Sequence, residues 1–149
     1  MSYQISEPVL SQLVGVWTPV LAVATPGDFA QTLTVQAGFY QKTGKLVTIH
    51  INMAWSSFTW TTASGVVTIT GVPFPCRSTS NYWAQGAFSF GGITNAGYTQ
   101  LTGHLTSTAA STVNFLMSGS GNALNALSVV SIPTGGTVRL RGSISYETD

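Results

Sequence analysis

Apolar and polar residues alternate strictly over two stretches of this chain, and this period of two is the strongest constraint on its fold. In residues 46–55, every second residue is large and apolar: Val47, Ile49, Ile51, Met53 and Trp55. Residues 137–146 repeat the pattern, with Val138, Leu140, Gly142, Ile144 and Tyr146 set against Thr137, Arg139, Arg141, Ser143 and Ser145. Alternate side chains of a strand point to opposite faces. Both stretches therefore predict β-strands with one face in a core.

Weaker stretches of the same kind occur throughout the chain. They are residues 17–24, 29–35, 39–42, 57–62, 66–70, 81–90, 98–106 and 113–117. Turn signals rich in Gly, Pro, Asn and Ser separate them, such as Pro26-Gly27-Asp28 and Gly91-Gly92. The pattern predicts an all-β fold, an antiparallel β-sandwich of jelly-roll type with about eight to ten short strands.

The chain has 149 residues, which fits one domain. We expect residues 1–16 to be a short N-terminal arm and residues 17–149 to be the β-sandwich domain. Leu10, Leu13, Val14 and Val16 make the arm apolar, and either a short helical turn or an extended segment fits its sequence. The first residues lack the basic and apolar regions of a secretory leader, and no apolar run is long enough to span a bilayer. We expect no membrane insertion.

Charged residues are scarce, and this restricts the classes of partner. The chain has five Lys and Arg and four Asp and Glu, a net charge of +1. A nucleic-acid reader needs a basic patch to neutralise phosphates, so nucleic-acid binding is excluded. A free monomer generally keeps charge on its surface, whereas interface cores are poor in charge and rich in aromatics. The composition therefore predicts a subunit of an obligate symmetric oligomer.

Reactive groups are too few and too scattered to predict an enzyme. Three of the four acids, Glu7, Glu147 and Asp149, lie near a terminus. Asp28 follows Pro26-Gly27, where an Asp is usually a turn residue, so no carboxylate pair for hydrolysis is evident. Cys76 is followed by Arg77, which would lower the pKa of the thiol, yet a free cysteine is more often a buried small apolar residue. We expect no catalysis, no cofactor and no metal site within one chain.

Two histidines and three aromatic residues remain as candidate site residues. His50 and His104 fall on the polar phase of their strands. In a trimer, a histidine near the three-fold axis would occur three times and could bind a metal or an anion; otherwise it would be hydrogen-bonded on a sheet face. Trp60, Tyr82 and Trp83 lie near strand ends or loops, where they could contact a glycan or another subunit. Trp55 is in phase with the predicted core.

Three segments, in their order and spacing, resemble a known family. They are residues 17–21 (WTPVL), 38–47 (GFYQKTGKLV) and 65–74 (GVVTITGVPF), and residues 142–146 (GSISY) resemble the closing strand of the same family. The chain thereby resembles the β-rich domains of tailed-bacteriophage virion proteins. These include distal tail-fibre domains and small capsid decoration, cement or head-fibre proteins. Thr43 departs from the pattern, because the family usually has an apolar residue there.

The resemblance implies a homotrimeric jelly roll without catalysis, located in the virion and assembled in the host cytoplasm. The expected function is capsid decoration: the trimer would attach to the major capsid protein or another virion protein and stabilise the shell. Leu10, Leu13, Val14 and Val16 of the arm would then dock on the capsid. The alternative is a receptor-binding tail-fibre tip that recognises host surface glycan through Trp60, Tyr82 or Trp83. A cellular lectin and a hydrolase fit the sequence less well, given the missing leader, the single cysteine and the scattered acids.

Overall fold

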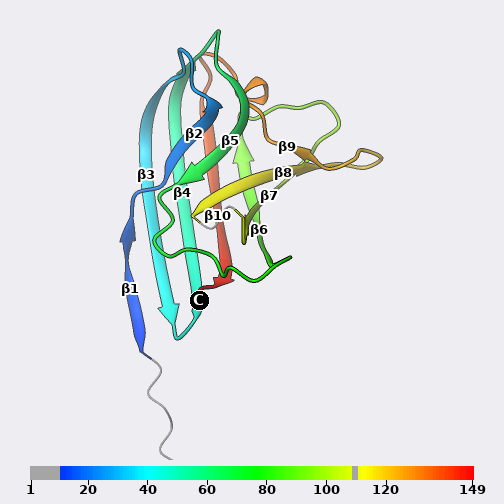
Figure 1. Cartoon of the computed structure of the whole chain (residues 1–149). Helices are drawn as coiled ribbons and strands as arrows, with labels where there is room; N and C mark the ends of the chain where they lie inside the picture. The colour runs from blue at the N-terminus through cyan, green and yellow to red at the C-terminus, as the bar shows by residue number, and fades with distance from the viewer. Residues whose placement is uncertain (1–10, 109–110) are drawn as a thin grey trace, which may run out of the picture.

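Ten strands form a single antiparallel sheet in the computed structural model, which describes residues 11–108 and 111–149 (Figure 1). The strands are β1 (Gln12–Trp17), β2 (Val20–Thr25), β3 (Ala30–Thr43), β4 (Leu46–Thr59), β5 (Ser64–Thr70), β6 (Trp83–Gly91), β7 (Gln100–Thr106), β8 (Thr112–Ser118), β9 (Asn125–Ala126) and β10 (Val138–Glu147). A short 3₁₀ turn, η1, covers Val129–Ser131. Within the described ranges, no helix has the length and apolar character needed to cross a membrane.

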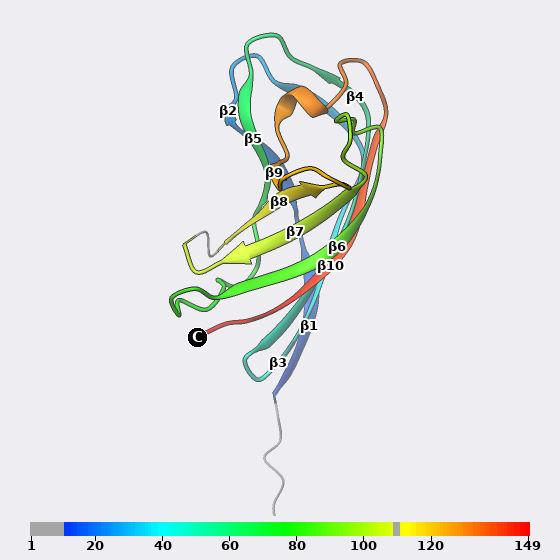
Figure 2. The same cartoon turned by 90° about the vertical axis from the view of Figure 1, so that its right-hand side faces the viewer.

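The sheet is curled so that its two halves face each other. The strand order is β1-β3-β4-β10-β6-β7-β8-β5-β2, and β9 pairs with β8. Figure 2 shows β2, β5 and β8 on one side of the molecule and β3, β4 and β10 on the other. The predicted all-β, antiparallel, sandwich-like class is confirmed, with both layers belonging to one continuous sheet. Every consecutive pair along this path is antiparallel.

The two stretches of strict alternation form the centre of the sheet. They lie in β4 and β10, which pair with each other from Leu46 opposite Glu147 to Trp55 opposite Val138. The β3–β4 hairpin closes at Gly44, whose φ of 58° is in the left-handed region that glycine adopts without a Cβ clash. The even-numbered polar residues of β4 face outward, as the period of two predicts.

Several boundaries differ from the sequence prediction. Residues 46–55 and 57–59 belong to the single strand β4, although the sequence predicts two strands there. Residues 30–35 and 39–42 belong to the single strand β3, because Gly38 makes room inside the strand and does not turn the chain: a Cβ there would lie 2.7 Å from the ring of Trp17. Residues 17–24 are instead divided by Thr18 and Pro19 into β1 and β2. The described part of the expected arm is neither helical nor free, since residues 12–17 pair with β3 as an edge strand.

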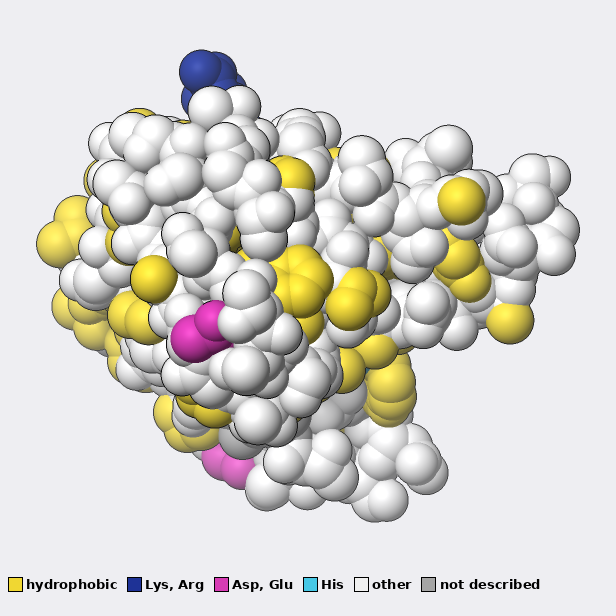
Figure 3. Space-filling view, turned by 90° about the horizontal axis from the view of Figure 1, so that it is seen from above, with side chains coloured by type: hydrophobic (Ala, Val, Ile, Leu, Met, Phe, Trp, Pro, Cys, Tyr) yellow, Lys and Arg dark blue, Asp and Glu magenta, His cyan; other side chains and the backbone are white. Residues whose placement is uncertain are grey.

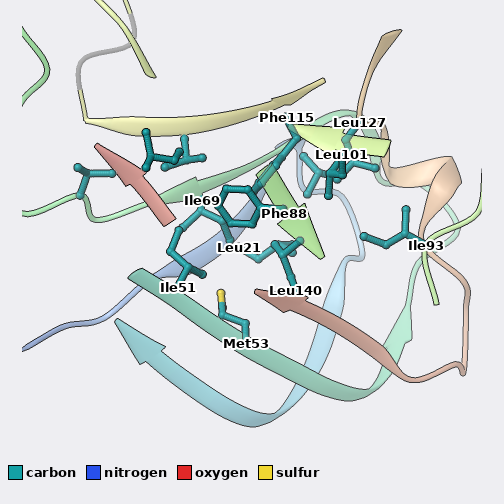
Figure 4. Packing of buried hydrophobic residues seen from close by; sticks show 14 of the residues in the cluster. Leu21, Ile51, Met53, Ile69, Phe88, Ile93, Leu101, Phe115, Leu127 and Leu140 are labelled. Carbon is teal, nitrogen blue, oxygen red and sulfur yellow. The ribbon is translucent and has the colours of Figure 1, made fainter. Parts of the chain in front are cut away.

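The core fills the space inside the curl (Figure 4). Its largest fully buried side chains are Trp55, Tyr146, Phe58, Phe115, Ile49, Met53, Ile69, Leu105, Met117, Leu127, Ile132 and Leu140. Trp55 is a core residue as predicted, and its indole Nε1 donates a hydrogen bond to Gln31 Oε1 at 2.8 Å. Phe88 packs edge-on against Phe115 with ring centroids 5.2 Å apart. Burial of these side chains supplies most of the favourable free energy of folding.

Phe74, in the loop after β5, is partly buried and packs against the core. Its ring lies edge-on to Tyr40, with centroids 5.3 Å apart. The Tyr146 hydroxyl donates a hydrogen bond to the Phe74 carbonyl at 2.8 Å. Burial raises the pKa of this hydroxyl above its ordinary range, so it stays a donor. The loop after β5 is thereby fixed to the last strand.

Candidate functional site

An exposed apolar surface lies on the outer face of the sheet at its β1 edge. We call the side chains of Val14, Val16, Phe39 and His50 the outer patch. Val16 pairs with Phe39, and Phe39 pairs with His50, so these three residues form one row across β1, β3 and β4. Val14, Val16 and Phe39 are 65%, 74% and 53% exposed. These large apolar side chains lie where a sheet face normally meets water.

A hollow of about 380 Å³ lies over this patch. It is lined by Val14, Gly15, Val16, Phe39, Tyr40, Gln41 and His50. None of the lining residues carries a carboxylate, an ammonium or a guanidinium group. Strand β1 is also an edge strand, and natural edges are usually protected by charged residues or proline. Gln12–Trp17 contains neither, which is typical of a surface that another protein covers.

The arm residues of the sequence prediction are divided between the two faces of β1. Val14 and Val16 belong to the outer patch. Leu13 alternates with them and is 49% exposed. Leu10 lies outside the described residues. Phe39 also belongs to the patch, although it is not among the candidates predicted from the sequence. Its position could have been inferred from the alternation of the strand, because Phe39 lies on the face opposite to Tyr40 and Lys42.

A second candidate lies at the start of β6, where the ring of Trp83 stacks on His104 of β7. The ring centroids are 4.9 Å apart and the planes are 13° from parallel. Trp83 is 54% exposed, whereas His104 is only 7% exposed and its Nδ1 has no hydrogen-bond partner among the described residues. Burial lowers the pKa of His104 from its ordinary value, because the charged form would lose water. The imidazole is therefore neutral at pH 7.

Trp60 and Tyr82 are tied into the fold by their polar atoms. The Trp60 indole Nε1 donates a hydrogen bond to the Ile132 carbonyl at 3.2 Å. The Tyr82 hydroxyl accepts one from the Glu147 amide at 2.7 Å. Both side chains are half-buried. Of the three aromatic candidates, Trp83 therefore presents the most ring surface to solvent.

The two histidines are not brought together. His50 lies on β4 and His104 on β7, three strands apart in the sheet order. His50 is exposed in the outer patch, and His104 is buried under Trp83. In the part of the chain that the structure describes, no three His, Cys, Asp or Glu side chains gather into a possible metal site.

Each carboxylate of the described chain is engaged in a structural contact. Asp28 accepts hydrogen bonds from the amides and hydroxyls of Thr61 and Thr62 at 2.5–2.9 Å, and these contacts hold its pKa far below the ordinary value. Glu147 forms a salt bridge with Arg77 at 2.6 Å. The Asp149 carboxylate accepts hydrogen bonds from the hydroxyl and amide of Ser78, which lower its pKa. The turn role expected for Asp28 matches its position.

Cys76 is 2% exposed, as expected for a buried small apolar residue. The sequence also suggested that Arg77 would lower the pKa of the thiol, and this is wrong: burial raises it, because the thiolate would be poorly solvated. The Arg77 guanidinium instead pairs with Glu147. The thiol therefore lacks both the access and the ionisation that a nucleophile needs.

Comparison with known proteins gives a fold relationship. Neither a protein-family profile nor a curated protein matches the chain. Among solved structures, the crystal structure of the Dettilon tailspike protein (gp208) is similar, with a TM-score of 0.67 at 16% sequence identity. The alignment covers 91% of this chain and 24% of that chain. The chain thus shares its fold with a region about a quarter of the tailspike in length.

Proposed function

We propose that this protein is a non-enzymatic structural component of a bacteriophage virion, and that it serves in the tail spike or tail fibre as a β-domain facing the host. The observation that carries the proposal is the fold likeness to a tailspike over 91% of the chain. The family resemblance of residues 17–21, 38–47 and 65–74 supports it independently. The structural use of Asp28, Glu147 and Asp149 supports a role without catalysis.

The location can be tested on intact particles. We expect a gold-labelled antibody against the chain to bind at the tail tip in electron micrographs, with particles lacking the gene as the negative control. Label on the head alone would overturn the tail assignment, and label on neither part would overturn the virion assignment.

We propose that the domain is a homotrimer in which the outer patch meets two further copies. The row of Val16, Phe39 and His50 supports this arrangement, because it exposes two large apolar side chains, contains no Lys, Arg, Asp or Glu, and is continuous with an unprotected edge strand. Interface cores are depleted of charge in the same way. In such a trimer, His50 of each copy would approach the axis.

Size-exclusion chromatography with light scattering tests the trimer. Phe39→Ser should release monomers, because it places a hydroxyl at the centre of the interface. Val130→Ser is the matched control, since Val130 is 73% exposed on η1, away from the outer patch. Wild-type protein that is a stable monomer at micromolar concentration would overturn the proposal.

Capsid decoration is the second candidate, and the exposed Val14 and Val16 on an edge strand favour it. In that role, β1 and the residues before it would dock on the shell. A truncation of residues 1–10 would leave the paired strand intact and separate docking from folding. Decoration predicts that the truncated protein binds particles that lack it more weakly, because Leu10 is lost while Val14 and Val16 remain; unchanged binding would contradict a contribution of residues 1–10 to docking.

Host recognition through Trp83 is the corresponding proposal for the tail role. The exposed indole face suits the CH face of a sugar ring. We expect Trp83→Ala to reduce adsorption of particles to host cells, and Trp60→Phe, which keeps an aromatic ring at a half-buried position, to leave it unchanged. Equal adsorption by Trp83→Ala particles would exclude this residue from recognition.

A further inference from the structure

A second hollow on the outer face of the sheet is lined by two arginines. Its volume is about 190 Å³, and its walls are Ser89, Phe90, Gly91, Arg139 and Arg141. It shares no residue with the outer patch. Arg139 pairs with Gly91 and Arg141 pairs with Ser89, so the hollow spans two neighbouring rows of β10 and β6. Both arginines point outward, since they alternate with the buried Val138 and Leu140.

These two guanidinium groups are not neutralised within the described chain. Its only salt bridge joins Arg77 to Glu147, which leaves Arg139 and Arg141 without an acidic partner in residues 11–108 and 111–149. Figure 3 shows Lys and Arg side chains protruding in one group at the rim of the molecule, apart from the Asp and Glu side chains. Two unpaired positive charges on adjacent outward positions repel each other. In a chain with so few charges, this placement points to an anionic ligand.

The hollow is held rigidly and its donors are partly oriented in advance. Strand β10 lies inside the sheet, with β4 on one side and β6 on the other. The Arg141 Nε donates a hydrogen bond to Asn52 Oδ1 at 3.0 Å. This contact fixes the guanidinium plane and leaves the two terminal nitrogens for a ligand. A planar guanidinium binds a carboxylate or phosphate group with two parallel hydrogen bonds.

Gly91 keeps the hollow open. A Cβ added at Gly91 would meet no atom within 4 Å, so the space above this residue is empty. Its backbone φ is not in the left-handed region, and a side chain is therefore sterically allowed there. Gly91 thus provides the space that a ligand would occupy, although the local backbone does not require glycine.

We propose that this hollow binds the acidic group of an anionic saccharide. A sugar acid or sugar phosphate offers an oxyanion for Arg139 and Arg141 and hydroxyls for Ser89, whereas the Phe90 ring faces the core and lies outside this contact. An acidic protein segment would use the guanidinium groups, but protein interfaces usually anchor on exposed aromatic or apolar side chains, which the hollow lacks. The inference rests on the proposed function, in which the domain faces a bacterial surface.

The test is a calorimetric titration of the full chain with galacturonate oligomers and with a phosphorylated galactose, using uncharged galactose oligomers as the reference. We expect binding of at least one of the acidic sugars and none of the uncharged sugar. Arg139→Gln and Arg141→Gln should each weaken binding about tenfold or more, the effect of losing a charge-assisted hydrogen bond. Gly91→Leu should abolish binding by filling the hollow while the melting temperature is kept.

Lys45→Gln is the matched control, because it removes one positive charge at the β3–β4 turn. It should leave binding unchanged. If Lys45→Gln weakened binding of the acidic sugar as much as the arginine variants do, the attraction would be general to positive charge. If a hexaglutamate peptide bound as tightly as the acidic sugar, the hollow would recognise acidic protein. Either result overturns the saccharide site. Failure to bind any acidic sugar at millimolar concentration also overturns it. None of these outcomes changes the location of the protein on particles, which tests the proposed function separately.

Discussion

The inner and outer faces of the same sheet use apolar side chains for different purposes. On the inner face, residues such as Ile49 and Phe115 are at most 2% exposed and hold the fold together. On the outer face, Val16 and Phe39 are more than half exposed although they belong to equally regular strands. An apolar residue in a strand therefore stabilises the monomer only if its phase directs it inward. The outward apolar residues are those that the proposed trimer would cover, and the outward arginines Arg139 and Arg141 are those that the proposed saccharide would contact.

The largest expected effect comes from removing an inward ring. Phe115→Ala should lower the free energy of unfolding by about 3–5 kcal/mol, because it removes buried area and leaves a cavity next to Phe88. Denaturant titration of a monomeric background, such as Phe39→Ser, measures this without the contribution of assembly. A loss below about 1 kcal/mol would show that the inner face is loosely packed.

Two glycines should respond to alanine with opposite signs. At Gly142 a Cβ would lie 2.6 Å from the ring of Phe88, so Gly142→Ala should destabilise the fold by about 1–3 kcal/mol. At Gly91, a Cβ meets open space, and Gly91→Ala should stabilise the strand by about 0.5 kcal/mol. Thermal unfolding of the two variants, measured side by side, checks the signs. Destabilisation by both would contradict the assignment of Gly91 to an open outer position.

His104 is an exception to this difference between the faces. Its position in the alternation of β7 places it on the outer face, yet its side chain is buried. Its pKa in the folded protein is below the value of about 6.5 that it has in an unfolded chain. As the pH falls through 6.5, the unfolded chain therefore takes up a proton that the folded protein does not, and stability decreases. We expect a smaller effect than that of Gly142→Ala.

Unfolding measured between pH 7.5 and pH 5 in wild type and His104→Gln tests this dependence, and the variant should show a flatter slope. Trp83→Ala should also flatten it, because removal of the stacked indole admits water to the imidazole. Identical slopes in all three proteins would mean that His104 is hydrated in the folded state.

The smallest effect on monomer stability is expected on the outer patch. Phe39→Ser should change the free energy of unfolding of the monomer by less than about 0.5 kcal/mol, as is usual for exposed positions. The same substitution should abolish trimerisation, so its effects on folding and on assembly differ sharply. A large loss of monomer stability would place Phe39 in the core and remove the difference between the faces.

Much of the inner face could be predicted from the sequence, because burial there follows the period of two. The alternate apolar residues from Val47 to Trp55 and from Val138 to Tyr146 face the core as expected. The division of β1 from β2, and the continuity of β3 through Gly38, depend on long-range packing of Trp17 against Gly38. Local sequence carries little information about such a contact.

The candidate sites were harder to predict. Strand phase places Arg139 and Arg141 opposite the predicted core residues and could have done the same for Phe39. The neighbours of the two arginines, however, come from β6 and β4, which are distant in sequence. The burial of His104 under Trp83 depends on the pairing of β6 with β7. The hydrogen bonds that engage Trp60 and Tyr82 depend equally on residues far along the chain, Ile132 and Glu147.

The single thiol of the chain has a practical consequence. Because Cys76 is sealed inside the native protein and disfavours the thiolate, an alkylating reagent reaches it only when the domain opens. The rate of alkylation in native buffer therefore reports opening events too rare to see by spectroscopy. The alkylation rate of Cys76 therefore measures transient unfolding of the natural protein, without an added label or an engineered cysteine.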